Sequence, residues 1–241
     1  MIDFTVNVLD HGYVTLRNIA GPTRRLGAEF DADDVDPANA ARFSFDGADD
    51  PNRTREDDLK LSEYLMKNRH TTPFEMVTVW LEMQMPLFVA RQFVRHRTVS
   101  INEVSARYTK LPNQFYIPDL SIIGRKSLLN KQGRDINGGS SKASVDFRNT
   151  LKALGSKSYL CYEQALDDGI PNELARCFLP VNIYTKWLWK QDLHNMMHFL
   201  SLRMHSHAQY ESRMYALAIY ALLDDYLPHS MKLFNKYCRQ S

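Results

Sequence analysis

The sequence predicts an α+β fold with an antiparallel or mixed sheet, flanking helices and a mainly helical C-terminal half. Residues 76–85 alternate between apolar and polar side chains, which is the pattern of a half-buried strand. From Ala143 onward, apolar side chains recur mainly at helical spacing. No internal repeat or linker divides the 241 residues, so we expect a single domain over residues 1–241.

The elements of the first half follow from alternation, helical spacing and breaker residues. His11-Gly12 separates two short alternating stretches and predicts a turn between two strands. Residues 29–58 hold eleven acidic and three basic residues, and we expect mostly surface loop there, interrupted at residues 40–45. A helix is expected over residues 57–68, and another from Pro86 through Phe93, because proline is well tolerated in a first turn.

The second half contains one clear helix end. A long helix is expected to end at Gly169, because glycine adopts the left-handed backbone that often closes a helix. The other expected elements are extended pieces at residues 105–110 and 115–117, a mobile loop over 132–142, a strand over 181–189, and helices over about 192–204 and 207–226.

The composition excludes several classes of function. The formal net charge of +2 gives no overall field that favours nucleic acid or a membrane surface. The longest apolar stretch, Met214–Leu223, is far shorter than the ~20 residues of a membrane span, and the chain does not open on a secretory signal pattern. The three cysteines are widely spaced and predict neither a disulfide framework nor a metal knuckle. We therefore expect a cytoplasmic protein with no membrane or nucleic-acid partner.

Positive charge is concentrated in residues 91–108. This segment contains four arginines and one histidine, interleaved with serine, asparagine and glutamate. Guanidinium groups match phosphate and carboxylate geometry in two-point contacts, so the cluster suits a nucleotide phosphate, pyrimidine carbonyls or a pyrophosphate. A solvated basic loop or a network of structural salt bridges would explain the composition equally well.

The predicted elements place these side chains on defined faces. Helical spacing puts Arg91 and Arg95 on one face of a helix, with Gln92 beside them. The chain is expected to leave this helix at about residue 96 and to form a strand from about Ser105. Ser105 and Arg107 would then share one strand face.

Two further arginines and three histidines are candidates for a site. Arg176 lies at the end of a predicted helix, where a cation interacts favourably with the helix dipole. Arg203 lies among apolar residues, where it either extends to solvent or meets a buried anion. His194 and His198 would share a helix face, but the glutamate of a zinc-protease helix is missing, so we expect no metal. His70 lies at a predicted helix-to-strand junction, where a capping role is the simpler interpretation.

Several common catalytic motifs are absent from the sequence. It has no GxGxxG turn, so any dinucleotide would be held in another way than by a Rossmann turn. It also has no phosphate-binding GxxxxGK[ST] loop and no GxSxG nucleophile motif. The cysteines lack neighbours that would activate a thiolate nucleophile.

Arg95-His96-Arg97, followed by Ser105 after seven residues, resembles the RHR-x7-S signature of the flavin-dependent thymidylate synthases. Further segments resemble the family in the same order along nearly the whole chain. They are Ala40–Ser44, His70–Glu75, Phe88–Gln92, Ser105–Tyr108, Ala175–Arg176, Leu179–Pro180, Phe199–Arg203 and Ser206–Glu211. The ordered set is more specific than the signature alone.

This resemblance implies a fold like that of the flavin-dependent thymidylate synthases and the reductive methylation of dUMP to dTMP. It implies methylenetetrahydrofolate as the carbon donor, tightly bound FAD as the carrier of reducing equivalents, and NADPH as their source. It also implies a homotetramer whose active sites take residues from several subunits.

The resemblance further implies roles for particular residues. Those that match dUMP-binding positions are Gln92, Phe93, Val94, Arg95, Glu103, Val104, Ser105, Ala106, Arg107, Arg176 and Arg203. Those that match FAD-binding positions are Thr72, Arg95, His96, Arg97, Glu103, Asp192, His194 and His198. His70 matches a position near the flavin and the folate, and we expect it to take part in catalysis together with Arg203.

The chemistry indicates how two of these residues would act. Uracil C5 must become nucleophilic before it accepts a one-carbon unit, and without a cysteine at C6 the ring can be polarised instead. The guanidinium of Arg203, directed at N3 and O4, would stabilise the enolate-like charge, and an apolar setting would strengthen its field. Ser105 has no adjacent base in the sequence, so we expect it to hydrogen-bond the phosphate or the ring rather than to act as a nucleophile.

Three alternatives stay open at the level of sequence. The first is a nucleic-acid-binding module that uses the arginine-rich segment, and the near-neutral charge argues against it. The second is a metal hydrolase built on four histidines of the C-terminal half, His194, His198, His205 and His207. The third is another flavin- and folate-dependent uracil methyltransferase. A yellow purified protein would exclude the first two alternatives.

Overall fold

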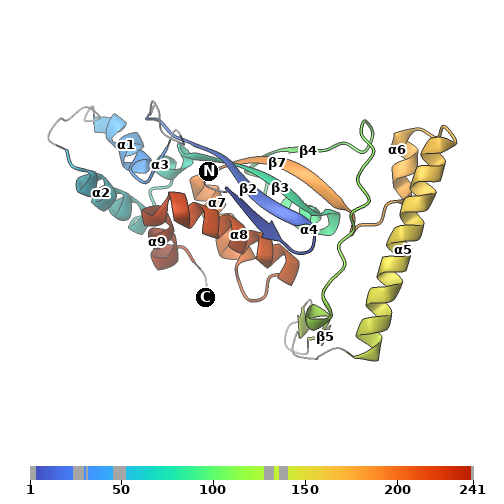
Figure 1. Ribbon diagram of the computed structural model, residues 1–241. Coiled ribbons are helices and arrows are strands. Elements are labelled where there is room, and N and C mark those ends of the chain that lie inside the picture. The colour runs from blue at the N-terminus through green and yellow to red at the C-terminus, as the bar shows by residue number, and fades with distance from the viewer. Residues whose placement is uncertain are drawn as a thin grey trace.

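The fold is built on a five-stranded antiparallel sheet (Figure 1). The structure is a computed structural model that describes residues 4–23, 30, 32–45, 53–127, 133–135 and 141–239. The strands lie in the order β1 (Thr5–Val8), β2 (Gly12–Ala20), β3 (Thr78–Pro86), β7 (Tyr184–Asp192) and β4 (Ser100–Glu103). The predicted α+β class, the antiparallel sheet and the turn between the first two strands are confirmed.

The centre of the sheet is the pair of long strands β3 and β7, which are in register from Thr78 opposite Asp192 to Pro86 opposite Tyr184. The apolar positions of β3 are fully buried, whereas the polar positions between them are partly exposed. The alternation therefore identified this strand correctly. The strand predicted over residues 181–189 lies three residues farther along the chain.

Three C-terminal helices cover the sheet and each other (Figure 1). Helix α8 (Tyr210–Tyr226) packs on β1 and β2, α7 (Leu193–Arg203) packs on β3 and β7, and α9 (Pro228–Tyr237) packs on α8. In the core between them, the Phe199 ring meets the rings of Phe93 and Trp189 edge-on, each at 4.9 Å between centroids. Helices α7 and α8 were predicted, but α9 was not. In the part of the chain that is described, no helix is both long and apolar enough to cross a membrane.

The acidic N-terminal stretch is more ordered than its charge predicts. The described part of residues 29–58 contains α1 (Asp36–Arg42), a 3-10 turn η1 (Phe43–Phe45) and the start of α2 (Arg55–Lys67), which is followed by α3 (Thr72–Glu75). The expectation of mostly surface loop is therefore wrong for these residues, while residues 46–52 lie outside the described ones. Three carboxylates of this stretch are buried, and each has partners that satisfy its charge. Asp34 accepts a hydrogen bond from a backbone N–H of α9, Asp36 accepts hydrogen bonds from nearby backbone N–H groups, and Asp58 forms ion pairs with Arg42 and Arg53.

The longest helix, α5 (Lys142–Asp167), stands apart from the helices on the sheet and is followed by α6 (Asn172–Ala175) and the 3-10 turn η4 (Arg176–Phe178) (Figure 1). Gly169 has φ +79°, which confirms the predicted left-handed end of this helix. Tyr159 and Tyr162 of α5 form a second apolar cluster with Leu111, among others. That both apolar clusters belong to one domain stays a prediction.

An extended segment leads from the sheet to α5. Phe115 forms an isolated bridge with Ile183, as expected for the extended piece at residues 115–117. The 3-10 turn η2 (Leu120–Ile122) and a small hairpin of β5 (Arg125–Lys126) and β6 (Arg134–Asp135) follow. The loop expected over residues 132–142 lies mostly outside the described residues, and β6 occupies part of the remainder.

The arginine-rich segment differs from its prediction at two points. Helix α4 (Leu87–Phe93) ends before Arg95, so Arg91 and Arg95 do not share a helix face. The strand of this segment is β4, which ends at Glu103. The strand expected from Ser105 is wrong: the carbonyl oxygen of Ser105 accepts hydrogen bonds from the N–H groups of residues 108 and 109, which makes residues 105–109 a turn. Ser105 and Arg107 are therefore neighbours on a turn and not on a strand face.

The turn between β1 and β2 offers a test of close packing. A Cβ atom on Gly12 would collide with the Tyr215 hydroxyl and lie 2.7 Å from the carbonyl oxygen of Val8. We expect Gly12→Ala to lower the free energy of unfolding by about 1–3 kcal/mol, because Tyr215 must move and lose its bond to the Gln84 carbonyl. Urea unfolding measures this loss. Asn7→Ala, an exposed strand position nearby, serves as the control, and equal stability of the two variants would contradict the packing argument.

Candidate functional site

The predicted site residues fall into three groups in the folded chain. The first group surrounds a cavity of about 320 Å³ where β4 ends. Glu103, Val104, Ser105 and Ala106 line it, together with Arg176 from the turn after α6. The structure therefore brings together two predicted segments that are about seventy residues apart in the sequence.

Local hydrogen bonds fix the shape of this first group. The carboxylate of Glu103 accepts a hydrogen bond from the Thr185 hydroxyl at 2.5 Å, which ties the end of β4 to β7. The N–H of Val104 donates to the Lys186 carbonyl at 2.9 Å. The Ser105 hydroxyl oxygen accepts the N–H of Arg107 at 3.3 Å, and among the described residues no imidazole or carboxylate bonds it. Ser105 thus has the surroundings of a hydrogen-bonding residue rather than of an activated nucleophile.

Arg176 of this cavity and Arg107, which follows Ala106 in the chain, both contact Glu173. The guanidinium of Arg107 lies 3.6 Å from the Glu173 carboxylate, and Nε of Arg176 donates to the Glu173 carbonyl at 3.2 Å. Both side chains of the Arg107–Glu173 pair are about half exposed. Because such exposed ion pairs contribute little, an anionic ligand can replace Glu173 as the partner of Arg107.

The second group joins α4, the turn after it and the end of α7. Nε of Arg203 donates to Nε2 of His96 at 3.0 Å, and its Nη2 donates to the Gln92 carbonyl at 3.1 Å. Both acceptors are neutral, and no carboxylate of the described residues pairs with Arg203. Burial lowers the pKa of Arg203. A half-buried cation without an acidic partner is suited to an anionic or electron-rich ligand.

His96 is a neutral acceptor in this arrangement. Burial lowers its pKa to about 4, and the positive charge of Arg203 acts in the same direction. Its ring meets Phe199 edge-on at 4.9 Å. His96 therefore orients the Arg203 guanidinium without competing for its charge.

The remaining residues of the signature segment differ in exposure. The Phe93 side chain is fully buried in the main core, so only its backbone could contact a ligand. Val94, Arg95 and Arg97 are exposed. The structure thus places the first and third residues of Arg95-His96-Arg97 at the surface and the second one inward.

The third group lines a cavity of about 580 Å³ between α2, α3, α7 and α9. His70, His194 and His198 line it together with the cationic residues Lys67 and Arg69. The structure therefore brings the three predicted histidines together. Among the described residues, no cluster of histidine, cysteine and acidic side chains is arranged to hold a metal ion.

Two predicted flavin positions lie at the edge of this third group. Thr72 is the first residue of α3, but the neighbouring Thr71 lines the cavity. Asp192 is the N-cap of α7, and its carboxylate accepts the N–H of Asn195 at 2.8 Å. A capping carboxylate stabilises the start of the helix that carries His194 and His198.

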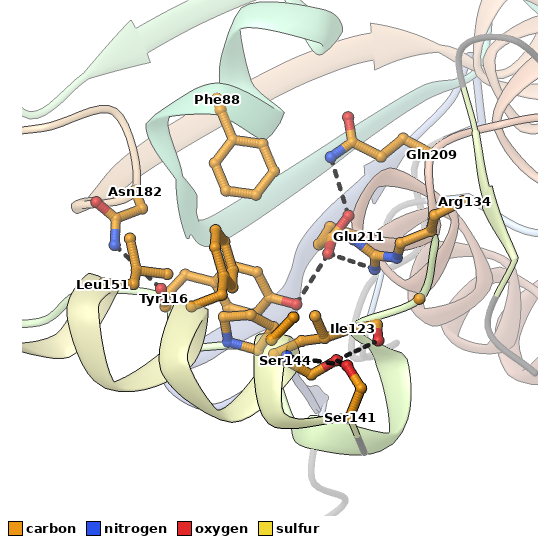
Figure 2. Close-up of a pocket in the computed structure, with 14 residues that line it drawn as sticks. Phe88, Tyr116, Ile123, Arg134, Ser141, Ser144, Leu151, Asn182, Gln209 and Glu211 are labelled. Atoms are coloured by element: carbon orange, nitrogen blue, oxygen red, sulfur yellow. Dashed lines mark hydrogen bonds and ion pairs between the residues drawn. The ribbon is translucent and has the colours of Figure 1, made fainter. Parts of the chain in front are cut away.

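A further cavity, of about 680 Å³, contains a polar cluster to which we assigned no role from the sequence (Figure 2). Glu211 is 1% exposed, and its carboxylate accepts hydrogen bonds from Tyr116, Arg134 and Gln209. Burial alone would raise the pKa of Glu211, but the hydrogen bond and charge of Arg134 outweigh it and lower the pKa below its usual value. In the sequence, Gln209 and Glu211 lie in the segment Ser206–Glu211, which resembles the family but was given no role.

Comparison with known proteins assigns the chain to a family. Residues 25–229 match the model of the thymidylate synthase complementing protein family. The flavin-dependent thymidylate synthase of Ruegeria pomeroyi is 40% identical over 95% of this chain and 72% of its own length. That of Dictyostelium discoideum is 41% identical over 98% of this chain and 75% of its own. The chain belongs to the flavin-dependent thymidylate synthase family.

A solved structure supports the same assignment for the fold. The UMP/dUMP methylase PolB from Streptomyces cacaoi, bound with 5-Br dUMP, superposes with a TM-score of 0.80 and 28% identity. The match covers 96% of this chain and 98% of that chain. The chain is thus an enzyme of the flavin-dependent thymidylate synthase family, and the predicted fold class is confirmed.

The neutral state of His96 has a consequence for stability. Its pKa is about 4 in the folded protein against 6.5 for an ordinary histidine, so the unfolded chain binds more protons at this residue between these two values. We expect the free energy of unfolding to fall as the pH is lowered through this window. In His96→Gln, whose amide oxygen can still accept from Arg203, that part of the loss should vanish.

Urea unfolding of both proteins at about pH 7 and about pH 5 measures this difference. Other titrating groups are common to both proteins and cancel in the comparison. An identical pH dependence of wild type and His96→Gln would show that His96 does not titrate as the geometry requires.

Proposed function

We propose that the protein catalyses the reductive methylation of dUMP to dTMP. Methylenetetrahydrofolate would donate the carbon, and bound FAD would carry reducing equivalents from NADPH, in the cytoplasm. The observation that carries the proposal is the cavity at the end of β4, where Glu103–Ala106 and Arg176 lie together in a member of this family. Arg176 in its lining and Arg107, next to Ala106 in the chain, suit a nucleotide phosphate.

The histidine-lined cavity fits a flavin nucleotide by its donor set. Lys67 and Arg69 supply cations for a diphosphate, while His194 and His198 offer ring nitrogens for hydrogen bonds to an isoalloxazine ring. When bound, FAD supplies the hydride chemistry, while the protein orients the reactants. His70, which lines the same cavity, would lie near the flavin and the folate.

We propose that the three groups of site residues described above come together in a homotetramer. Gln92 and Arg203, which are both expected at the dUMP site, are not among the residues that line the cavity at the end of β4. Large apolar side chains along α5, such as Phe147, Leu154 and Leu160, are exposed in the single chain, which supports an assembly that covers them. A neighbouring subunit would then complete each site.

Within such a site, Arg203 is proposed to activate the pyrimidine. Its guanidinium is held by two neutral acceptors and lacks a carboxylate partner among the described residues. Directed at N3 and O4 of uracil, it would stabilise the negative charge that grows as C5 becomes nucleophilic. This route needs no cysteine adduct at C6. Burial raises the pKa of Cys238, which disfavours its thiolate.

Substitution of Arg203 tests this role. We expect Arg203→Ala to reduce dTMP formation by at least about a hundredfold, because the charge developing on the ring loses its stabilising partner. Reduction of the flavin by NADPH should stay partly intact, since that step does not involve uracil. Product formation and the flavin absorbance measure the two steps separately.

Arg55→Ala, which removes an exposed arginine paired with Asp33 far from the site, is the matched control and should leave both steps unchanged. Wild-type turnover in Arg203→Ala would show that another group activates the ring. Loss of both steps together would show a structural or flavin-binding role instead.

The cysteines provide a second test. Cys161, Cys177 and Cys238 are all free thiols, and we expect their joint replacement by serine to leave dTMP formation within about threefold of wild type. The measurement is turnover of the triple variant at full flavin occupancy. A folded triple variant without activity would establish a thiolate route.

A second candidate substrate is UMP, because the Streptomyces cacaoi neighbour is described as a UMP/dUMP methylase. The activated ring is the same, so the arginine argument applies to both nucleotides. The two differ only at the ribose 2′-hydroxyl. Turnover measured with each nucleotide separately distinguishes the candidates.

A further inference from the structure

A continuous path of hydrogen bonds leads from the buried Glu211 to Gln92, a candidate substrate-binding residue. The amide nitrogen of Gln209 donates to Oε2 of Glu211 at 2.9 Å, with its oxygen on the other side (Figure 2). That amide oxygen accepts a hydrogen bond from Nε2 of Gln92. The amide oxygen of Gln92 in turn accepts from the Ser212 hydroxyl at 2.8 Å.

The ionised carboxylate fixes the direction of every bond along this path. A carboxylate only accepts, so Gln209 must turn its NH₂ group toward Glu211 and its oxygen toward Gln92. Gln92 must then turn its own NH₂ group toward Gln209 and its oxygen toward Ser212. An amide alone can be flipped end for end, because its oxygen and nitrogen have similar shapes. Here the flipped orientation would place two oxygens or two NH₂ groups in contact.

Glu211 has the surroundings of a permanent acceptor. Tyr116 and Arg134 donate to its Oε1 at 2.9 and 2.7 Å, while Gln209 uses Oε2. It also lies in the first turn of α8, where the helix dipole favours a negative charge. The opposing guanidinium of Arg134 is itself half-buried, which keeps the pair little screened by water.

Gln92 therefore presents a hydrogen-bond donor of fixed orientation. Its amide nitrogen carries two hydrogens, of which Gln209 takes one, and no second partner of this nitrogen lies among the described residues. The backbone carbonyl of the same residue holds the guanidinium of Arg203. Gln92 thus contacts the path from the buried carboxylate with its side chain and the proposed activating arginine with its backbone.

We propose that Glu211, Gln209 and Ser212 are positioning residues that hold the Gln92 amide as a donor to an oxygen atom of the pyrimidine nucleotide. The inference rests on the proposed function, because it takes the ligand of Gln92 to be dUMP. The oxygen acceptor is a uracil carbonyl or a phosphate oxygen. A ligand that offers a donor at that point would face the NH₂ group and be rejected.

The test measures dUMP affinity by calorimetry with the flavin-loaded protein. Gln92→Ala removes the donor itself and is expected to weaken dUMP binding about tenfold. Glu211→Gln keeps the shape but allows either amide orientation, and Ser212→Ala removes the donor that holds the Gln92 oxygen. Each is expected to weaken binding about three- to tenfold. Glu56→Gln, an exposed carboxylate paired with Lys60, is the control and should bind as wild type.

A double-mutant cycle separates positioning from a general structural role. If Glu211 acts through Gln92, Glu211→Gln should have no further effect on dUMP affinity in the Gln92→Ala protein. Independent structural damage would instead multiply the two losses. Because Glu211→Gln leaves Arg134 without its charged partner, the same cycle with Ser212→Ala covers the case in which that variant does not fold. Flavin content and the thermal midpoint of each protein establish that it is folded.

The outcomes identify which proposal fails. Non-additive losses in either cycle support the positioning role, and additive losses or unchanged affinity in Glu211→Gln and Ser212→Ala overturn it. Unchanged affinity in Gln92→Ala also overturns it, while the proposed function stands if dTMP is still formed. A wild-type protein that does not bind dUMP at all overturns the proposed function and, with it, the ligand assigned to Gln92.

Discussion

The antiparallel pairing of β3 with β7 is the constraint on which the candidate sites depend. β3 runs directly into α4, which carries Gln92, and β7 runs directly into α7, which carries Arg203 at its far end. Because the two strands are antiparallel, their helices start at opposite ends of the pair. Helix α7 then runs back across the sheet, and its eleven residues span about 16 Å, which brings Arg203 to the end of α4. β4 pairs with the edge of β7 that faces away from β3. Its last residue, Glu103, lines the same cavity as Ser105 and Arg176.

The electrostatics of the chain are local rather than global. The formal net charge is only +2, yet the signature segment carries the exposed Arg95 and Arg97, and Arg203 makes its hydrogen bonds to the neutral His96 ring and the Gln92 carbonyl. Many of the acidic residues that balance this charge lie in the N-terminal stretch and have their own partners, as Asp58 does with Arg42 and Arg53. Near-neutrality of the whole chain therefore coexists with a cationic region that can attract a nucleotide.

Local periodicity predicted the parts of the fold whose burial pattern is local. The alternation in β3 and the glycine at the end of α5 are of this kind, because each follows from neighbours in the sequence. The acidic stretch could not be predicted in this way. Asp34 is buried because it accepts hydrogen bonds from Ser230, 196 residues away, and charge counting does not detect such a partner. In the same way, the resemblance to the family pointed to His96, in the signature, and to Arg203, in a separate segment, but the bond between them depends on how α7 packs.

Gln92 shows how a buried charge can act on a site that it does not touch. A carboxylate that served only the stability of α8 would need no more than Arg134 and Tyr116 as partners. Glu211 has a third donor, Gln209, whose oxygen faces out of the buried cluster toward α4. Neutral amides carry no charge from Glu211 to the site, but they fix the orientation of the next amide, because each donor must face an acceptor. The ion pair with Arg134 offsets the cost of burying Glu211. The remaining oxygen of Glu211 determines how the Gln209 amide is oriented, and through it the side-chain amide of Gln92, whose backbone carbonyl contacts Arg203.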